Sequence, residues 1–140
     1  MNTITVETVV DQPVERVWIF WTEPGHIEEW NHASDDWECS YAENDLQAGG
    51  TFSSTMGAID GSISFDFSGI YSEVVPLQKI SYTLGDGRRV TITFEDLSDT
   101  STKVTETFGP ETENSHEIQR AGWQAILDNF KAHAEAQSVT

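Results

Sequence analysis

The residue with the clearest chemical potential is Glu106, in the alternating segment 102–108. Side chains two positions apart in a strand share a face, so the Glu106 carboxyl lies on the same face as Val104 and Phe108. A carboxylate that faces an apolar enclosure has a raised pKa unless a donor stabilises its charge. Glu106 is therefore a candidate polar group of a binding site. The alternative is a β-bulge near the strand end that turns Glu106 outwards.

The neighbours of Glu106 depend on the register of the last predicted hairpin. If paired residues have numbers that sum to about 198 to 200, the cross-strand neighbour of Glu106 is Ile92 or Phe94. Arg88 then lies too far along its strand to neutralise the carboxylate. Glu106, Ser54 and either the Tyr82 hydroxyl or a tryptophan N–H would be the few polar groups of an otherwise apolar pocket, which is the usual make-up of a small-molecule site.

Other chemical groups do not form a recognised pattern. His26, His32, Asp35 and Asp36 are close in the chain, but their spacing matches no known set of metal ligands. Cys39 has no basic neighbour to lower its pKa, so a structural role is favoured. No phosphate loop, dinucleotide fingerprint or Gly-x-Ser-x-Gly motif occurs. We therefore expect no metal, no cofactor and no catalytic residue, which favours a protein that is not an enzyme.

The elements that must position these residues follow from hydrophobic period and turn signals. An alternating strand at 3–9 precedes two short helices, one opened by Pro13 and the other capped by Thr22-Glu23-Pro24 and ending at Trp30. Six strands follow at 37–41, 51–56, 62–73, 79–84, 88–97 and 102–108. Turn residues such as Gly49-Gly50, Asp60-Gly61 and Gly85-Asp86-Gly87 separate them, and such short connections indicate antiparallel neighbours.

The alternation within these strands predicts a sheet with one polar and one apolar face. The expected apolar face carries Phe52, Met56, Ile63, Phe65, Phe67, Ile80, Tyr82, Leu84, Val90, Ile92, Phe94, Val104 and Phe108. The segment 115–136 has a helical period, with a capping-box-like start at Asn114 and Glu117. At about 1.5 Å per residue it is about 33 Å long, so we expect this helix to cover the apolar face.

The long helix has two apolar stripes. Trp123, Leu127, Phe130 and Ala134 form one, which we expect to close the core, and Ile118, Gly122 and Ile126 form the other, which we expect to roof the pocket. Gly122 costs roughly 1 kcal/mol relative to alanine in a helix interior. It either leaves space for a ligand or permits close approach of another backbone segment. Trp30, at the end of a short helix, is the candidate for the mouth of the pocket.

Length and charge limit the possible functions. A chain of 140 residues corresponds to about one domain. The formal charge of −17 argues against nucleic-acid or anionic-membrane partners, since both require a basic face. No apolar run approaches the length of a membrane span, and no secretory signal pattern opens the chain, so we expect a cytoplasmic protein without membrane insertion.

The chain resembles a known superfamily over nearly its whole length. The residues that carry the resemblance are Pro13-Val14-Glu15-Arg16-Val17-Trp18, the segment 24–30, Gly49-Gly50-Thr51-Phe52, Gly69 with Tyr71, Glu73, Val74 and Pro76, Thr105-Glu106-Thr107-Phe108, and Gly122-Trp123 with Leu127-Asp128-Asn129-Phe130. With this order of elements, the chain resembles the SRPBCC or START-like (Bet v 1-like) superfamily, in the branch of heat-shock-protein-90 ATPase activator homologues. It departs from that pattern at Asn31, where a second aromatic residue is expected after Trp30.

The resemblance implies an α+β helix-grip fold over residues 1–140: a curved antiparallel sheet of about seven strands around the long C-terminal helix, with two short helices after the first strand. It also implies a cavity between sheet and helix that binds a lipid, sterol, polyketide or aromatic molecule. The expected ligand-binding residues are Trp30, Phe52, Ser54, Phe65, Phe67, Tyr82, Ile92, Glu106, Phe108, Ile118, Gly122 and Ile126. The alternatives are a cyclase or dehydratase that uses Glu106, and a cochaperone-like protein with a chaperone partner. Under each of these functions we expect a monomer or a homodimer.

Overall fold

The computed structural model describes residues 3–137, and the elements follow the predicted order. Strand β1 (Ile4–Val10) precedes the short helices α1 (Val14–Thr22) and α2 (Pro24–Trp30). The remaining strands are β2 (Trp37–Asn44), β3 (Thr51–Ala58), β4 (Ser64–Val75), β5 (Lys79–Leu84), β6 (Arg89–Ser98) and β7 (Ser101–Phe108). The long helix α3 (His116–Ala136) ends the described part of the chain.

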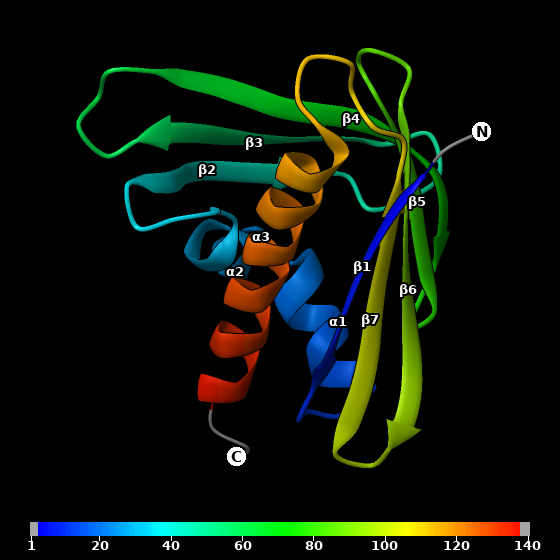
Figure 1. Cartoon of the computed structure of the whole chain (residues 1–140). Coiled ribbons are helices and arrows are strands. Elements are labelled where there is room, and N and C mark those ends of the chain that lie inside the picture. Colours follow the sequence, from blue (N-terminus) through cyan, green and yellow to red (C-terminus); the bar gives the residue numbers. More distant parts are fainter. Residues whose placement is uncertain (1–2, 138–140) are drawn as a thin grey trace.

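The seven strands form one antiparallel sheet in the order β1-β7-β6-β5-β4-β3-β2. Helices α1 and α2 carry the chain from one edge strand, β1, to the other, β2. Register shifts between Cys39 and Tyr41 and between Tyr71 and Glu73 are bulges, which bend the strands that contain them. The sheet curls into an open half-barrel, with β2, β3 and β4 turned away from the direction of β1, β7 and β6 (Figure 1). The predicted fold is confirmed.

The two faces of the sheet differ as the alternation predicts. Ile80, Ile92 and Val104 are fully buried on the inner face. Ile63 and Phe65 differ from the prediction, because both are exposed large apolar side chains. They belong to the β3–β4 hairpin, whose tip extends past α3 (Figure 1), so no helix covers them.

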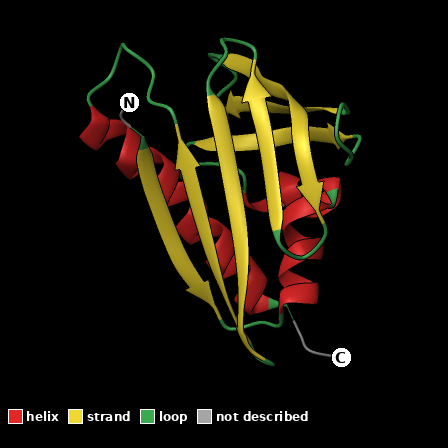
Figure 2. Cartoon of the chain, turned by 90° about the vertical axis from the view of Figure 1, so that its right-hand side faces the viewer, coloured by secondary structure: helices red, strands yellow, loops and turns green. Residues whose placement is uncertain are grey.

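All three helices lie on the concave side of the sheet (Figure 2). The expectation that α3 alone covers the apolar face is therefore wrong. Helix α3 packs beside β1, α1 packs against β6 and β7, and α2 packs against β2. Trp18 of α1 contacts Phe94 of β6 edge to face, with ring centroids 5.3 Å apart. Because the sheet curls through a wide arc, a single straight helix cannot contact all of its strands.

The two short helices begin at the prolines that the sequence predicts as helix starts. Pro13 is the residue before the first turn of α1, and Pro24 occupies the first turn of α2. The Thr22 hydroxyl donates a hydrogen bond to the Trp18 carbonyl oxygen, which keeps Thr22 within α1. The indole N–H of Trp30 donates to the Phe20 carbonyl oxygen at 2.9 Å, so the end of α2 is tied to α1.

The N-cap of helix α3 lies one residue later than predicted. Ser115 is the N-cap, and its hydroxyl accepts a hydrogen bond from the Ile118 N–H. Asn114 instead donates to the Glu111 carboxylate, so it does not cap the helix. At the other end, the buried Gln12 side chain donates to the Ala134 carbonyl oxygen at 2.8 Å. Within residues 3–137, none of the helices combines the length and apolar character that a membrane crossing requires.

Candidate functional site

A cavity of about 270 Å³ lies between the inner face of the curled sheet and the helices. Its walls come from β3, β4, β5 and β7 and from all three helices. It is lined by Trp21, Thr22, Ile27, Trp30, Asn31, Phe52, Ser54, Met56, Phe65, Phe67, Tyr71, Ile80, Tyr82, Glu106, Trp123 and Ile126. Most of these side chains are apolar, and half of them are aromatic, so the interior favours an apolar molecule.

The aromatic side chains of the lining contact one another across the cavity wall. Phe52 meets Tyr82 edge to face with ring centroids 4.6 Å apart, and Phe67 meets Trp123 at 6.2 Å. Trp21 and Trp30 pack together on Phe130 of α3. These contacts hold the rings in fixed orientations, because each ring is packed on more than one side.

Glu106 faces this cavity from β7. Its neighbours across the sheet are Ile92 of β6 and Val6 of β1, both fully buried, and its own exposed fraction is 5%. Among the described residues, none donates a hydrogen bond to its carboxyl. Every fully buried side-chain oxygen in this part of the chain has a hydrogen-bond partner. Because the Glu106 carboxyl has none, its oxygens are not fully buried, and they border the open space of the cavity.

Burial away from water raises the pKa of Glu106 from its ordinary value to about 8. The carboxyl is therefore largely protonated at neutral pH and can donate a hydrogen bond as well as accept one. Of the two neighbours predicted for Glu106, Ile92 or Phe94, the structure has Ile92, and the outward-turning bulge is wrong. The nearest register shift of β6 lies between Asp96 and Ser98, at the far end of the hairpin.

Two tyrosines supply further polar groups to the cavity. Burial, together with the nearby Glu106 charge, raises the pKa of Tyr82 well above its ordinary value. Burial also raises the pKa of Tyr71 to about 12. Both hydroxyls therefore stay protonated at neutral pH and remain hydrogen-bond donors. Ser54, buried on β3, adds a third hydroxyl, so the cavity has a small polar region within an apolar wall.

Phe65, and not Trp30, is the exposed residue of the cavity lining. Trp30 lines the cavity but is only 5% exposed, so the prediction that Trp30 lies at the mouth of the pocket is wrong. Its indole is held inside by the hydrogen bond to the Phe20 carbonyl oxygen. Phe65 is 50% exposed and also lines the cavity, in edge contact with Trp37. The accessible side of the cavity is therefore the part next to the β3–β4 hairpin.

The structure brings together eight of the residues expected at the site and places four elsewhere. Those at the cavity are Trp30, Phe52, Ser54, Phe65, Phe67, Tyr82, Glu106 and Ile126. Ile92 and Phe108 lie in the core, with Phe108 stacked under Trp123 at 3.9 Å. Ile118 is 62% exposed, and Gly122 does not line the cavity. A Cβ added at Gly122 would meet no atom within 4 Å, so the close approach of another segment is excluded.

The rotation of α3 explains these differences. In its first turns, Gln119 is the buried residue, and its side chain contacts the Glu111 backbone through two hydrogen bonds. The stripe that faces inwards therefore begins at Gln119 and continues through Trp123 and Ile126 to Leu127. Because glutamine is polar, hydrophobic patterning missed its place in this stripe and assigned the apolar Ile118 instead.

Several lining residues were not expected at the site: Trp21, Thr22, Ile27, Asn31, Met56, Tyr71, Ile80 and Trp123. Those of α1 and α2 come from helices that the sequence did not connect with the apolar face. Met56 and Ile80 belong to the predicted inner face, so that pattern already contained the signal for them. Trp123 was predicted to pack in the core. It does so, because its indole stacks on Phe108, and it also lines the cavity.

Comparison with known proteins places the chain in a family. The family model described as "Activator of Hsp90 ATPase homolog 1-like protein" matches residues 11–135. An AHSA1-like protein from Aeromonas hydrophila is 41% identical, with a TM-score of 0.90 over 96% of this chain and 93% of that chain. A protein from Cytophaga hutchinsonii is 50% identical, with a TM-score of 0.83 over the same shares of both chains.

More distant structures share the fold alone. A protein from Chromobacterium violaceum is 24% identical, with a TM-score of 0.82 over 98% of this chain and 100% of that chain. A search of curated proteins found no match. The match of the family model to most of the chain, the identity to the two solved structures and the helix-grip fold all agree. The chain belongs to the Activator of Hsp90 ATPase homolog 1-like family of the SRPBCC superfamily.

Proposed function

We propose that the protein binds a small, largely hydrophobic molecule in the cavity between the sheet and the helices. The observation that carries this proposal is the aromatic lining with one protonated carboxyl, Glu106, among a few hydroxyls. Binding sites for small molecules have this composition, in which apolar surface supplies affinity and a few polar groups fix orientation. We expect the ligand to be a lipid, sterol, polyketide or aromatic molecule.

The size of the cavity limits the ligand. Its volume of about 270 Å³ is just below the range of small-molecule pockets, which measure roughly 300 to 1,000 Å³. A ring system or a single acyl chain suits this volume better than a complete diacyl lipid. A ligand that enters beside Phe65 would place a polar end towards Glu106 and Tyr82, where a hydroxyl or carbonyl group can form hydrogen bonds with them.

Tryptophan fluorescence tests the proposal directly, because Trp21, Trp30 and Trp123 line the cavity. We expect saturable quenching by at least one member of a panel of fatty acids, sterols and flavonoid-like aromatics. Native mass spectrometry of protein purified from its host should also detect a bound molecule. If neither experiment detects a ligand, the proposal is wrong.

A matched pair of variants separates the cavity from other sites on the protein. Ser54→Leu adds bulk inside the cavity, whereas Ser53→Leu adds the same bulk on the opposite face of β3. We expect Ser54→Leu to weaken binding at least tenfold, and Ser53→Leu to leave it unchanged. Equal affinity of both variants for the ligand would place the binding site elsewhere.

The raised pKa of Glu106 also favours a second candidate, an enzyme of the cyclase or dehydratase type. A carboxyl that titrates near neutral pH can act as a general acid or base, and the protonated Tyr82 hydroxyl beside it can donate a hydrogen bond to the substrate. In this case, Glu106→Gln should abolish turnover of a bound ligand while binding is retained. Unchanged turnover in this variant would exclude the mechanism.

A chaperone-related function is a third candidate, which the family description raises. Ile59, Ile63 and Phe65 expose large apolar side chains on the β3–β4 hairpin, and such patches mark interaction sites. In the cytoplasm, this hairpin could contact a chaperone. A pull-down from host lysate should then recover the host Hsp90-type chaperone with the wild type but not with an Ile59→Ser, Ile63→Ser variant. Absence of the chaperone from the wild-type sample would remove this candidate.

A further inference from the structure

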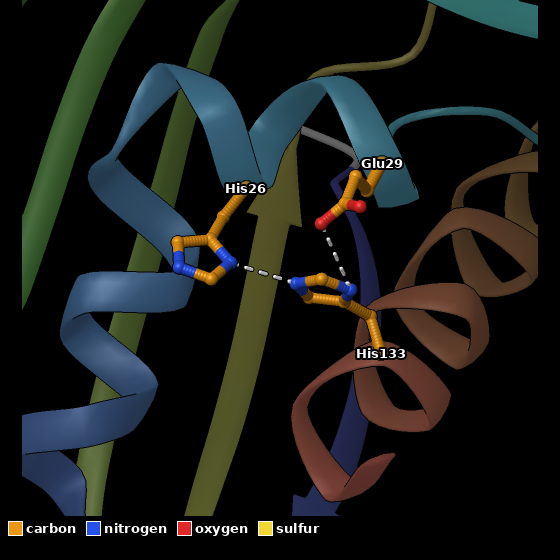
Figure 3. Close-up of side chains that lie close together, drawn as sticks. All are labelled: His26, Glu29 and His133. Atoms are coloured by element: carbon orange, nitrogen blue, oxygen red, sulfur yellow. Dashed lines mark hydrogen bonds and ion pairs between the residues drawn. The ribbon is translucent and has the colours of Figure 1, made fainter. Parts of the chain in front are cut away.

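A cluster of metal-binding side chains lies outside the cavity, between α2 and the last turns of α3. It consists of His26 and Glu29 of α2 and His133 of α3 (Figure 3). The His26 Nδ1 atom is 2.9 Å from the His133 Nε2 atom, and the Glu29 carboxylate is 3.7 Å from the His133 Nδ1 atom. One ligand atom from each residue lies within 4.8 Å of the other two.

The two facing histidine nitrogens are spaced nearly as in a zinc site, whereas Glu29 lies beside the other nitrogen of His133 and must turn to complete the ligand set. A tetrahedral Zn²⁺ ion with bonds of about 2.0 to 2.1 Å holds its ligand atoms roughly 3.3 Å apart. The two ring nitrogens already lie within a few tenths of an ångström of that separation. In their hydrogen bond, the lone pair of one nitrogen accepts the proton that the other carries. An ion can bind both nitrogens once the donor ring loses that proton or carries it on its other nitrogen. The Glu29 side chain is 64% exposed, so solvent rather than packed protein surrounds most of it.

We propose that His26, Glu29 and His133 bind a divalent transition-metal ion of the zinc type, which joins α2 to α3. Two imidazoles and one carboxylate form a ligand set that suits Zn²⁺, whereas Mg²⁺ prefers oxygen ligands alone. The ion replaces the hydrogen bond between the two rings, and water completes its coordination. The net charge of −17 favours the approach of cations to the protein in general.

The surroundings support a fixed site. His133 is only 11% exposed on its side chain, and the Phe20 ring contacts both histidine rings edge to face. This packing limits the orientations of the two imidazoles before an ion arrives. Glu29 leaves one side open to solvent, through which an ion can reach the rings.

The position of the cluster gives the ion a structural consequence. None of the three ligands lines the cavity, but Ile27 and Trp30, which are their neighbours in α2, do. An ion that joins α2 to α3 would therefore fix two elements of the cavity wall relative to each other. The proposal does not depend on the identity or existence of a cavity ligand.

The test measures Zn²⁺ binding to the full chain after removal of any affinity tag. Calorimetric titration should give one saturable site, Co²⁺ should give a visible absorption spectrum of low-symmetry coordination, and Mg²⁺ should not bind at the same concentration. Zn²⁺ should also raise the melting temperature. We expect His26→Gln and Glu29→Gln to weaken Zn²⁺ binding by roughly tenfold or more each.

The control is His116→Gln, which removes an exposed histidine from the first turn of α3, away from the cluster. It should bind Zn²⁺ as the wild type does. His133→Gln should also lose binding, but it changes a partly buried residue, so His26→Gln and Glu29→Gln provide the decisive comparison. Absence of a saturable Zn²⁺ site in the wild type would overturn the proposal, and so would full binding by His26→Gln.

Discussion

Replacing Glu106 with glutamine should change how the stability of the protein depends on pH. Glutamine has nearly the same shape as a protonated glutamate but cannot ionise. In the folded protein, burial raises the pKa of Glu106 from 4.5 to about 8. Between these two values, the folded state keeps a proton that the unfolded chain releases. The wild type is therefore most stable, with respect to this group, below about pH 4.5, and it loses that stability as the pH rises towards 8.

The magnitude follows from the shift. The difference between 8 and 4.5 is 3.5 units, and at about 1.4 kcal/mol per unit it corresponds to about 5 kcal/mol in the free energy of unfolding. Most of this difference, about 3 kcal/mol, develops between pH 4.5 and pH 7. These values are upper limits, because water that enters the cavity beside the ionised carboxylate would reduce the penalty.

The assay is urea unfolding of the wild type and Glu106→Gln, followed by tryptophan fluorescence at several pH values between about 5 and 9. Subtracting one unfolding free energy from the other removes the contributions of the other titrating groups, because both proteins contain them. We expect this difference to shift steadily in favour of Glu106→Gln as the pH rises. Glu95→Gln makes the same substitution at an exposed position of β6 and provides the control for the change of side chain. Parallel profiles for Glu106→Gln would refute the desolvation argument.

Three further changes in unfolding free energy can be measured by the same method. Gly122→Ala should stabilise the protein by about 1 kcal/mol, because alanine favours the helix and its methyl group meets open space; a loss of stability would contradict that geometry. Ser115→Ala should cost about 1 kcal/mol through loss of the N-cap, and Asn114→Ala should cost less, so the reverse order would contradict the assigned cap. Gln12→Ala should cost about 2 kcal/mol, because its amide hydrogen bonds to the Ala134 and Gln137 carbonyl oxygens are lost, and an effect within about 0.5 kcal/mol of zero would contradict their importance.

Much of the fold could be predicted because its signals are local. Alternation along residues 102–108 depends only on the two-residue period of a strand, and it placed Glu106 correctly on the inner face. Pro13 and Pro24 act on the backbone around them, so they marked the starts of the two short helices. The resemblance to a known superfamily added the arrangement of these elements in space.

The candidate site was predicted less well, because it depends on how packed elements are turned. Helical period identifies stripes but not which stripe faces the sheet. Ile118 was chosen because it is apolar, whereas the buried position belongs to Gln119, whose amide satisfies loop backbone groups. Likewise, Ile92 and Ile80 are both buried and have the same pattern in sequence, but only Ile80 lines the cavity, and only the packing around each distinguishes them.

The sequence by itself determined the order of the elements, the two faces of the sheet and the inward direction of Glu106, because each follows from periodicity or from residues a few positions apart. Only the tertiary structure decided that three helices share the concave side, that Phe65 is the exposed residue of the cavity lining, and that His26 meets His133 across 107 positions. These features arise from contacts between distant segments, which no local pattern records. The strand that carries Glu106 could be read from its own residues, but the cavity it faces is made by the rest of the chain.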